Sequence, residues 1–361
     1  MAKIGIIDDW VNPKYLSEKW KVRYIFTEGA DKESREQSEE LLTHATVIAK
    51  ILEEQTKDYE IINFVLTRRM EEPVDIRRLQ SALELCLKEE VDILCMSLGT
   101  IRMSERNYMY PQIRTLYKRG VILIAAADNE GCYMMPAAME EVIGVDVALG
   151  EPRRPGEYYF CGENLWRIDF QADCRFQIQL DGKEICPCTS YAVPVIAARV
   201  NNLLNQGFWG QAEIRKQLER YAAGRIRIKR DMEEGKGEIS LPVVGSCELE
   251  EKEWISFIEM MQSKFGVDAA GLQAGKKIKD GRFLRTGGQT RENWKEMLWQ
   301  IECYTAAELV LAVLPEEKEW CDILIRKTEQ GSYQCIVPET KEEVYKEELE
   351  KVCKWIIDIL S

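Results

Sequence analysis

The stretch Cys188–Thr189–Ser190–Tyr191–Ala192–Val193–Pro194 leads directly into an apolar run at residues 195–200. A serine in a short turn is followed here by sequence that predicts a helix, and Pro194 fits its first turn, where the missing N–H has no partner to lose. A hydroxyl at a helix start lies where the helix dipole and unpaired N–H groups favour a developing negative charge. Ser190 is therefore either an ordinary N-cap serine or a candidate nucleophile, and the rest of the chain bears on that choice.

Ahead of this serine, short apolar stretches that favour strands alternate with stretches that favour helices. Strands are expected at residues 3–7, 60–66, 92–96, 121–127 and 142–145, and helices near 43–52, 74–89 and 108–119. This alternation predicts βαβ units, and hence an α/β fold with a mainly parallel sheet between two layers of helices. In such a sheet function gathers at the carboxyl ends of the strands, where Asp8, Ser97 and Asn129 fall.

The region around the serine is expected to finish this domain. Residues 155–187 are strand-rich and irregular, with a strand at 176–180 and a hairpin turn at Asp181–Gly182. The serine helix is expected to continue to about 205, and an amphipathic helix follows at 210–221.

At 361 residues the chain is long enough for two domains. We expect a first domain at residues 1–230, a linker or strand segment at 231–246, and an α+β domain at 247–361. Within the last, the pattern predicts helices at 249–264, 291–303 and 341–360, a loop at 271–288, and strands at 307–314, 321–327 and 332–337. This domain contains no repeat and no chemical motif, because Gly275–Lys276–Lys277 lacks the rest of a P-loop pattern.

Composition excludes several classes of function. The net charge of −13 argues against binding to nucleic acid or to an anionic membrane. No apolar run is long enough to span a membrane, and we expect neither a signal peptide nor a propeptide, which predicts a cytoplasmic protein. Twelve cysteines spread over the chain are typical of free thiols in a reducing compartment. With one histidine, one tight cysteine pair and no acidic loop of calcium-binding type, no metal or cofactor is expected.

An acid, a histidine and a serine occur in this order along the predicted sheet. Asp8 ends the first strand, His44 begins a helix after the N-cap candidate Thr43, and Ser190 begins the later helix. This is one of the chain orders in which acid–histidine–serine triads are found. Taken singly, each residue also has an ordinary interpretation: Asp8 as part of a turn, and His44 as a packing or surface residue.

The motifs at these positions resemble those of the subtilisin-like serine peptidases (subtilases) over residues 3–223. The matching segments are IID at 6–8, HATVIA at 44–49, DILCMSLG at 92–99, AAADNEG at 125–131, PA at 136–137 and TSYAVP at 189–194. Each motif is weak alone, but together they occur in the family's order and with comparable gaps. The resemblance implies a subtilisin-like three-layer αβα fold and the activity of a serine protease.

The resemblance also implies a role for each residue. Ser190 would be the nucleophile, His44 the base that takes its proton, and Asp8 the residue that orients the imidazole. The Asn129 amide, together with the Ser190 backbone N–H, would form the oxyanion hole. The edge Ser97, Leu98 and Gly99 would bind an extended peptide substrate by strand pairing.

Four positions depart from the family's pattern, which has glycine there: Trp10, Ala45, Asp128 and Cys188. Extra side-chain atoms in these tight turns would narrow the site, favour small side chains, or disable it. Asp128 is expected to line the substrate cleft and to favour a basic side chain at the cleavage site.

Two hypotheses remain open. The first is an intracellular serine endopeptidase of narrow specificity that matures a precursor or leader peptide. The second is a pseudo-protease, a peptide-binding or scaffold protein that kept the cleft and lost turnover. In both, the partner is a peptide or protein, and residues 247–361 are expected to bind a protein partner, the substrate or a second copy, or to brace the first domain.

Overall fold

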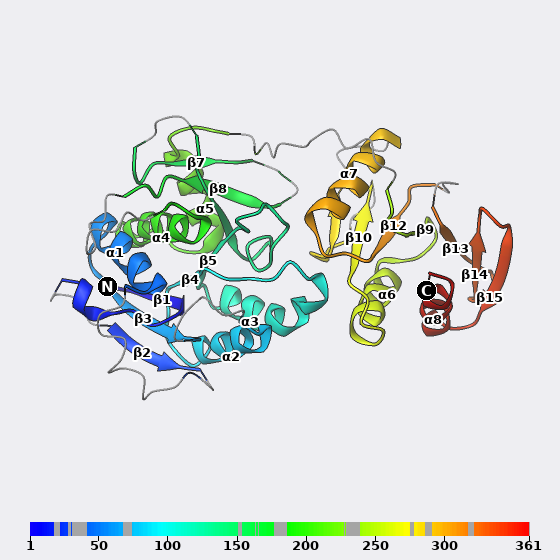
Figure 1. The fold of residues 1–361 in the computed structure, drawn as a ribbon, viewed down its shortest axis with the longest axis horizontal. Coiled ribbons are helices and arrows are strands. Elements are labelled where there is room, and N and C mark those ends of the chain that lie inside the picture. The colour runs from blue at the N-terminus through cyan, green and yellow to red at the C-terminus, as the bar shows by residue number, and fades with distance from the viewer. Residues whose placement is uncertain are drawn as a thin grey trace. The chain divides into compact units, whose positions relative to one another are not determined.

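Figure 1 shows the computed structural model of the chain, which divides into two units. The first comprises Met1–Thr100 and Glu105–Asp231, and the second comprises Ile101–Ser104 and Met232–Ser361. The structure describes residues 1–17, 22–27, 30, 42–67, 74–150, 154–162, 164, 166–176, 186–226, 228, 239–274, 278–285, 291–316 and 321–360. Within these ranges, none of the helices combines the length and the apolar character that crossing a membrane requires.

In the described part of the first unit, eight strands form one sheet in the order β2-β3-β1-β4-β5-β6-β8-β7. The strands are β1 (Ala2–Asp8), β2 (Val22–Phe26), β3 (Tyr59–Val65), β4 (Ile93–Met96), β5 (Ile122–Ala126), β6 (Ile143–Val147), β7 (Tyr158–Phe160) and β8 (Ile168–Ala172). Neighbours are parallel except at one edge, where β7 runs antiparallel to β8. The central strands are almost continuously apolar because both faces of the sheet are covered.

Helices cover the two faces of this sheet (Figure 1). On one face lie α1 (His44–Gln55), α4 (Thr189–Asn205) and α5 (Gln211–Tyr221); on the other lie α2 (Ile76–Cys86) and α3 (Arg106–Lys118). Short 3-10 turns occupy Pro13–Tyr15 and Met103–Glu105. The predicted three-layer αβα architecture with a mainly parallel sheet is confirmed.

Helix α4 is the main packing element of the first unit. Its buried residues, rich in alanine, valine and isoleucine, pack against β1, β4, β5, β6 and β8 and against α1 and α5. The helix begins at Thr189, so Pro194 lies in its second turn rather than in the first turn that the sequence indicates. The missing N–H of Pro194 therefore removes the bond that would otherwise reach the carbonyl of Ser190.

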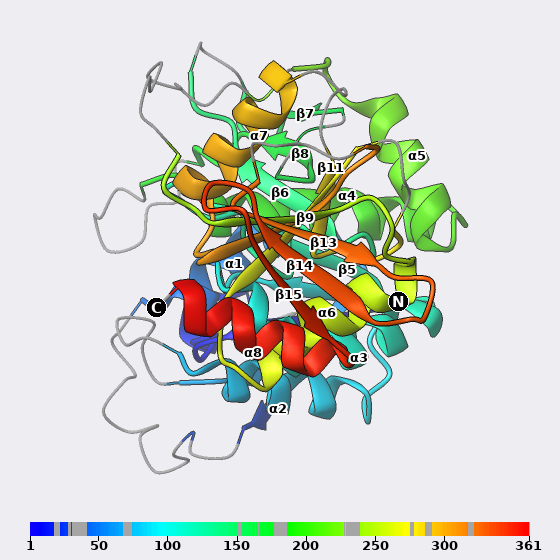
Figure 2. The same ribbon diagram turned by 90° about the vertical axis from the view of Figure 1, so that its right-hand side faces the viewer.

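The second unit is built on a sheet whose described strands follow the order β11-β10-β12-β9-β13-β14-β15. They are β9 (Val243–Ser246), β10 (Ala269–Gln273), β11 (Phe283–Arg285), β12 (Leu309–Val313), β13 (Ile323–Lys327), β14 (Tyr333–Val337) and β15 (Glu342–Lys346). Pairing is parallel from β11 to β13 and antiparallel from β13 to β15. Figure 2 shows α6 (Glu251–Ser263) and α8 (Leu349–Leu360) on one face of this sheet and α7 (Arg291–Tyr304) on the opposite face.

This sheet contains more strands than the sequence indicates. β10 begins just before the stretch predicted as a loop, and most of β10 and all of β11 lie within it. β9 lies in the segment predicted as a linker or strand and pairs with both β12 and β13. The closing helix begins at Leu349 because β15 takes the first part of the stretch predicted as helix. Three predicted features lie outside the described residues: the turn at Asp181–Gly182, nearly all of the strand before it, and the segment Gly275–Lys276–Lys277.

Gly271 shows why β10 is hard to recognise from its sequence. A Cβ atom at this position would lie 2.3 Å from Cδ1 of the buried Phe283 ring, so the strand requires a residue with low strand propensity. The packing of an aromatic ring from β11 therefore determines a residue that local sequence would assign to a loop.

We predict that Gly271→Ala lowers the free energy of unfolding by about 1–3 kcal/mol, because the added methyl group overpacks the ring of Phe283. Urea denaturation followed by tryptophan fluorescence measures the change. Gly224→Ala is the matched control, since the nearest atom to its new Cβ is 3.6 Å away. A Gly271→Ala protein as stable as wild type would contradict the packing argument, and Phe283→Leu in the same chain should restore part of the loss.

Candidate active site

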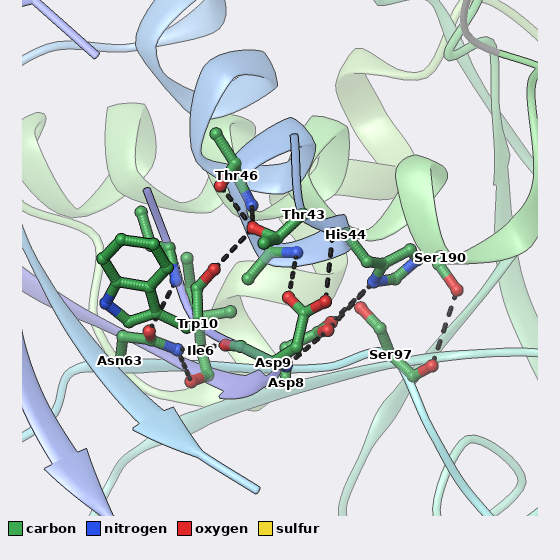
Figure 3. A network of polar contacts seen from close by, with 12 residues as sticks. Ile6, Asp8, Asp9, Trp10, Thr43, His44, Thr46, Asn63, Ser97 and Ser190 are labelled. Carbon is green, nitrogen blue, oxygen red and sulfur yellow. Dashed lines mark hydrogen bonds and ion pairs between the residues drawn. The ribbon is translucent and has the colours of Figure 1, made fainter. Parts of the chain in front are cut away.

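Asp8 and His44 are in direct contact at the carboxyl edge of the first sheet (Figure 3). Asp8 ends β1 and is completely buried, and His44 is the first residue of α1. The imidazole Nδ1 lies 3.0 Å from one carboxylate oxygen of Asp8 and 2.9 Å from the other. With Nδ1–H donating to the carboxylate, Nε2 is left as the nitrogen that can accept a proton.

Asp9 holds the same histidine through its backbone. One carboxylate oxygen accepts a hydrogen bond from Ala45 N at 2.8 Å, and the other accepts one from His44 N at 3.2 Å. Asp9 therefore satisfies two of the N–H groups that a helix N-terminus leaves without partners. Thr43 is the N-cap, as the sequence indicates, and accepts from Thr46 N. Sequence reasoning missed this role of Asp9, because the sequence alone does not distinguish an aspartate in a turn from one that caps a helix in a distant segment.

Asn63 of β3 fixes the loop that follows the two acids (Figure 3). Its side-chain N–H donates to the Asp9 carbonyl at 3.0 Å, and its side-chain oxygen accepts from Val11 N at 2.9 Å. Trp10 lies in this loop and contacts the ring of Tyr24, with centroids 6.2 Å apart. The neighbouring strands β1 and β3 thus cooperate to hold Asp8 and Asp9 in place.

Burial and neighbouring charges shift the pKa values of Asp9 and His44. Burial raises the pKa of Asp9 to about 8, and the adjacent Asp8 carboxylate adds to the rise, against the two backbone hydrogen bonds and His44. Burial opposes the charged form of His44, but the Asp8 carboxylate, hydrogen bonds with Asp8 and Cys188, and the charge of Asp9 together raise its pKa well above the ordinary value. Below about pH 8 the site therefore favours an imidazolium paired with the buried Asp8 carboxylate, beside a protonated Asp9.

Ser190 reaches the same edge from α4. It follows Thr189 in the first turn of the helix, and its side chain is largely buried. The hydroxyl donates to the carbonyl oxygen of Ser97, 3.5 Å away (Figure 3). The ring of Tyr191, which follows Ser190, stacks on the His44 imidazole with centroids 5.0 Å apart, so the two helix N-termini lie together.

Asn129 is oriented by the start of α4. Its side-chain oxygen accepts hydrogen bonds from Thr189 N at 3.2 Å and from the Thr189 hydroxyl at 2.9 Å. With the oxygen held in this way, the amide N–H groups point away from Thr189 and can serve another acceptor. Asn129 is exposed, in contrast to the buried strand β5 that precedes it.

The predicted substrate edge follows β4. Ser97 is buried, Leu98 is half-buried and Gly99 is exposed. The next residue, Thr100, pairs with Met135 through hydrogen bonds of 2.7 Å and 2.9 Å. A Cβ atom on Gly99 would lie 2.2 Å from the Met135 carbonyl oxygen, so this close approach requires glycine.

Asp128 has a structural role in its own loop. One carboxylate oxygen accepts hydrogen bonds from Glu130 N and Cys132 N, each at 2.9 Å. The expected contribution of Asp128 to substrate binding therefore remains a prediction.

The four positions that depart from the glycine pattern carry no backbone strain. The described non-glycine residues with positive φ are Asp58, Arg167 and Lys341, and none of the four is among them. The side chains at these positions therefore do not force an unfavourable backbone conformation.

No arrangement for a metal ion is found in the part of the chain that the structure describes: no group of three or more histidine, cysteine, aspartate or glutamate side chains is placed to hold one.

The parallel sheet, the helices on both faces, and the placement of Asp8, His44 and Ser190 at one edge correspond to the subtilisin-like αβα fold. No family model and no curated protein matches the chain.

Among solved structures, the chain is similar to the prenylagaramide maturation protease PagA, with 16% identity over 60% of this chain and 79% of that one and a TM-score of 0.39. It is also similar to the PatG macrocyclase in complex with peptide, with 17% identity over 61% of this chain and 82% of that one and a TM-score of 0.45. A lanthipeptide protease has 12% identity over 61% and 80%, with a TM-score of 0.45.

We predict that Asp9→Asn weakens the dependence of stability on pH. An unfolded aspartate ionises near 3.8, whereas folded Asp9 keeps its proton up to about 8. Between these values unfolding releases a proton, so the contribution of Asp9 to stability falls as pH rises. Asparagine keeps an oxygen acceptor for the helix N–H groups but does not titrate.

Thermal unfolding followed by circular dichroism across this pH range provides the measurement. The wild-type Tm should fall more steeply with rising pH than that of Asp9→Asn. Parallel curves for the two proteins would show that Asp9 titrates in the folded state as it does in the unfolded chain.

Proposed function

We propose that the first unit is a serine endopeptidase that cleaves peptide bonds through an acyl-enzyme. The observation that carries this proposal is the contact between the buried Asp8 carboxylate and Nδ1 of His44, with Ser190 at the start of a helix whose N-terminus adjoins the imidazole. An acid that fixes the histidine tautomer and a hydroxyl at a helix N-terminus are the parts that nucleophilic acyl transfer needs.

In this mechanism the Ser190 hydroxyl turns from the Ser97 carbonyl to Nε2 of His44 when substrate binds. The 3.5 Å hydrogen bond to Ser97 is long, and catalytic hydrogen bonds commonly shorten only in the substrate complex. His44 takes the proton as the oxygen attacks the peptide carbonyl, and then delivers it to the leaving amine. Asp8 stabilises the imidazolium that forms between the two steps.

The negative charge of the tetrahedral intermediate would be held by Asn129 and the start of α4. The amide oxygen of Asn129 is fixed on Thr189, which leaves its N–H groups to donate to the oxyanion. The Ser190 backbone N–H belongs to the first turn of α4 and supplies a second donor, aided by the helix dipole.

We further propose that the peptidase acts on few substrates, inside the cell, with maturation of a precursor or leader peptide as its reaction. An extended peptide would pair with Ser97, Leu98 and Gly99 at the exposed end of the β4 segment. Side chains at positions 128 and 188, where the resemblance would place glycine, would narrow the site and favour few substrates. The expected partner is a peptide or protein.

The alternative function is a peptide-binding pseudo-protease. Two observations favour it. The Ser190 hydroxyl donates to the Ser97 carbonyl, and the buried Asp8 carboxylate favours the protonated form of His44, which cannot act as a base. A cleft of this kind would bind a peptide without cleaving it.

We predict that a fluorophosphonate probe labels the wild-type protein and that Ser190→Ala and His44→Ala abolish labelling. The probe reacts only with a serine activated by its base, so it reports on the assembled nucleophile without knowledge of the substrate. Ser263→Ala, in the second unit, is the matched control and should be labelled like wild type. A folded wild-type protein that takes up no probe would establish the pseudo-protease instead.

We predict that Asn129→Ala lowers the rate of labelling by about 10²–10³-fold, the loss that removal of one oxyanion-hole donor causes in serine peptidases. Asn205→Ala, at the far end of α4 and exposed, should be labelled at the wild-type rate. Equal rates for Asn129→Ala and wild type would remove Asn129 from the oxyanion hole and leave the nucleophile itself untouched.

A further inference from the structure

Three cysteines flank the start of α4, and their environments differ. Cys174 follows β8 and is buried, Cys186 is exposed, and Cys188 is half-buried and occupies the N-cap position of the helix. The Cys174 thiol donates to the carbonyl oxygen of Cys188, with sulfur and oxygen 3.5 Å apart. The two residues are therefore held side by side, although they are 14 positions apart in the sequence.

Cys188 is also in contact with the proposed catalytic histidine. Its thiol is close enough to the His44 imidazole to contribute to the raised pKa of that histidine, and Cys188 lies two positions before Ser190. Cys188 is the N-cap residue of α4 and makes no side-chain bond to the helix. Because the residue is only half-buried, a small oxidant such as a peroxide can reach it.

The other thiols of the first unit differ in accessibility. Cys86, Cys95 and Cys161 are buried, and burial raises the pKa of Cys95 to about 12. Cys132 is half-buried and Cys186 is exposed, but it is the backbone of Cys188 that the Cys174 thiol contacts. Oxidation that ends in a disulfide with Cys174 is therefore expected at Cys188.

We propose that Cys188 is an oxidation site that closes a disulfide with Cys174 and thereby switches off the neighbouring Ser190–His44 centre. The loss of activity in this proposal rests on the function proposed above, whereas the formation of the disulfide does not.

The chemistry needs only a peroxide as oxidant. The Cys188 thiolate attacks one oxygen of hydrogen peroxide, the O–O bond breaks, and a sulfenic acid and a hydroxide ion form; the hydroxide takes up the thiol proton as water. The Cys174 sulfur then attacks the sulfenic sulfur, the S–O bond breaks, and a second water leaves with the Cys174 proton. The two sulfurs lose two electrons in total, and the peroxide accepts both.

The disulfide would disturb the centre at two points. It converts the thiol near His44 into a disulfide, and it ties the N-cap of α4 to the segment after β8. Because Ser190 lies within the same helical turn, its hydroxyl would lose the position from which it can turn to His44. A reductant would reverse the change.

The test treats the full chain with hydrogen peroxide, blocks free thiols with an alkylating agent, and maps peptides by mass spectrometry with and without reductant. We expect a peptide pair linked through Cys174 and Cys188 that is absent from Cys188→Ala and Cys174→Ser. Cys186→Ser is the matched control and should form the same link. In parallel, fluorophosphonate labelling of wild type should be lost on oxidation and restored by dithiothreitol.

Several outcomes would overturn the proposal. One is a Cys188 that remains free for alkylation while other cysteines are oxidised; another is a link between Cys188 and Cys186. The proposal would also fail if peroxide suppressed the labelling of Cys188→Ala as strongly as it suppresses the labelling of wild type. If untreated wild type takes up no probe, the peptidase function fails, but the peptide map still decides whether the disulfide forms.

Discussion

Two consecutive acids at the end of β1 hold one histidine from two sides, and the rest of the site depends on this arrangement. Asp8 contacts the imidazole, and Asp9 accepts the backbone N–H groups of His44 and Ala45. Placing two acids in a buried position is unfavourable unless their oxygens are paired or hydrogen-bonded. Here the imidazolium pairs with Asp8, and the N–H groups that begin α1 bond to Asp9, so the strand end, the helix start and the charge of His44 stabilise one another.

Helix α4 supplies the other half of the site. Its deep burial against the central strands fixes its direction and brings its N-terminus to the carboxyl edge of the sheet, beside the N-terminus of α1. Two helix N-termini that meet at one point create a positive potential, which favours an anion between them. The oxyanion of acyl transfer is such an anion. The fold therefore provides electrostatic stabilisation before any particular side chain is considered.

Much of the first unit could be predicted because its local signals agree with its tertiary structure. Buried parallel strands are continuously apolar, and the helices between them have clear caps, as at Thr43. The edge strand β2, half-buried with Arg23 exposed, gives no such signal, and sequence reasoning did not find it. In the second unit, β10 and β11 depend on the contact between Gly271 and Phe283, which becomes visible only in three dimensions.

The residues of the candidate site could be predicted where they lie at the ends of strands and helices, but their contacts with one another could not. Asp8, His44 and Ser190 lie at element boundaries that the pattern marks, and the structure brings them to one edge. The cap formed by Asp9, the stacking of Tyr191 and the hydrogen bond between Ser190 and Ser97 join residues from different elements. Contacts of this kind have no periodicity, so the sequence carries no sign of them.

The four positions at which the resemblance would place glycine are not equivalent, and this bears on whether the chain is a peptidase. Trp10 packs toward Tyr24, and the carboxylate of Asp128 bonds within its own loop. Ala45 is buried at the start of α1, where its N–H bonds to Asp9. Cys188 is the one of the four that contributes to the raised pKa of His44. Of the four departures, Cys188 therefore bears most directly on the histidine, and the case for lost catalysis otherwise depends on the protonation of His44 and on the hydrogen bond from Ser190 to Ser97.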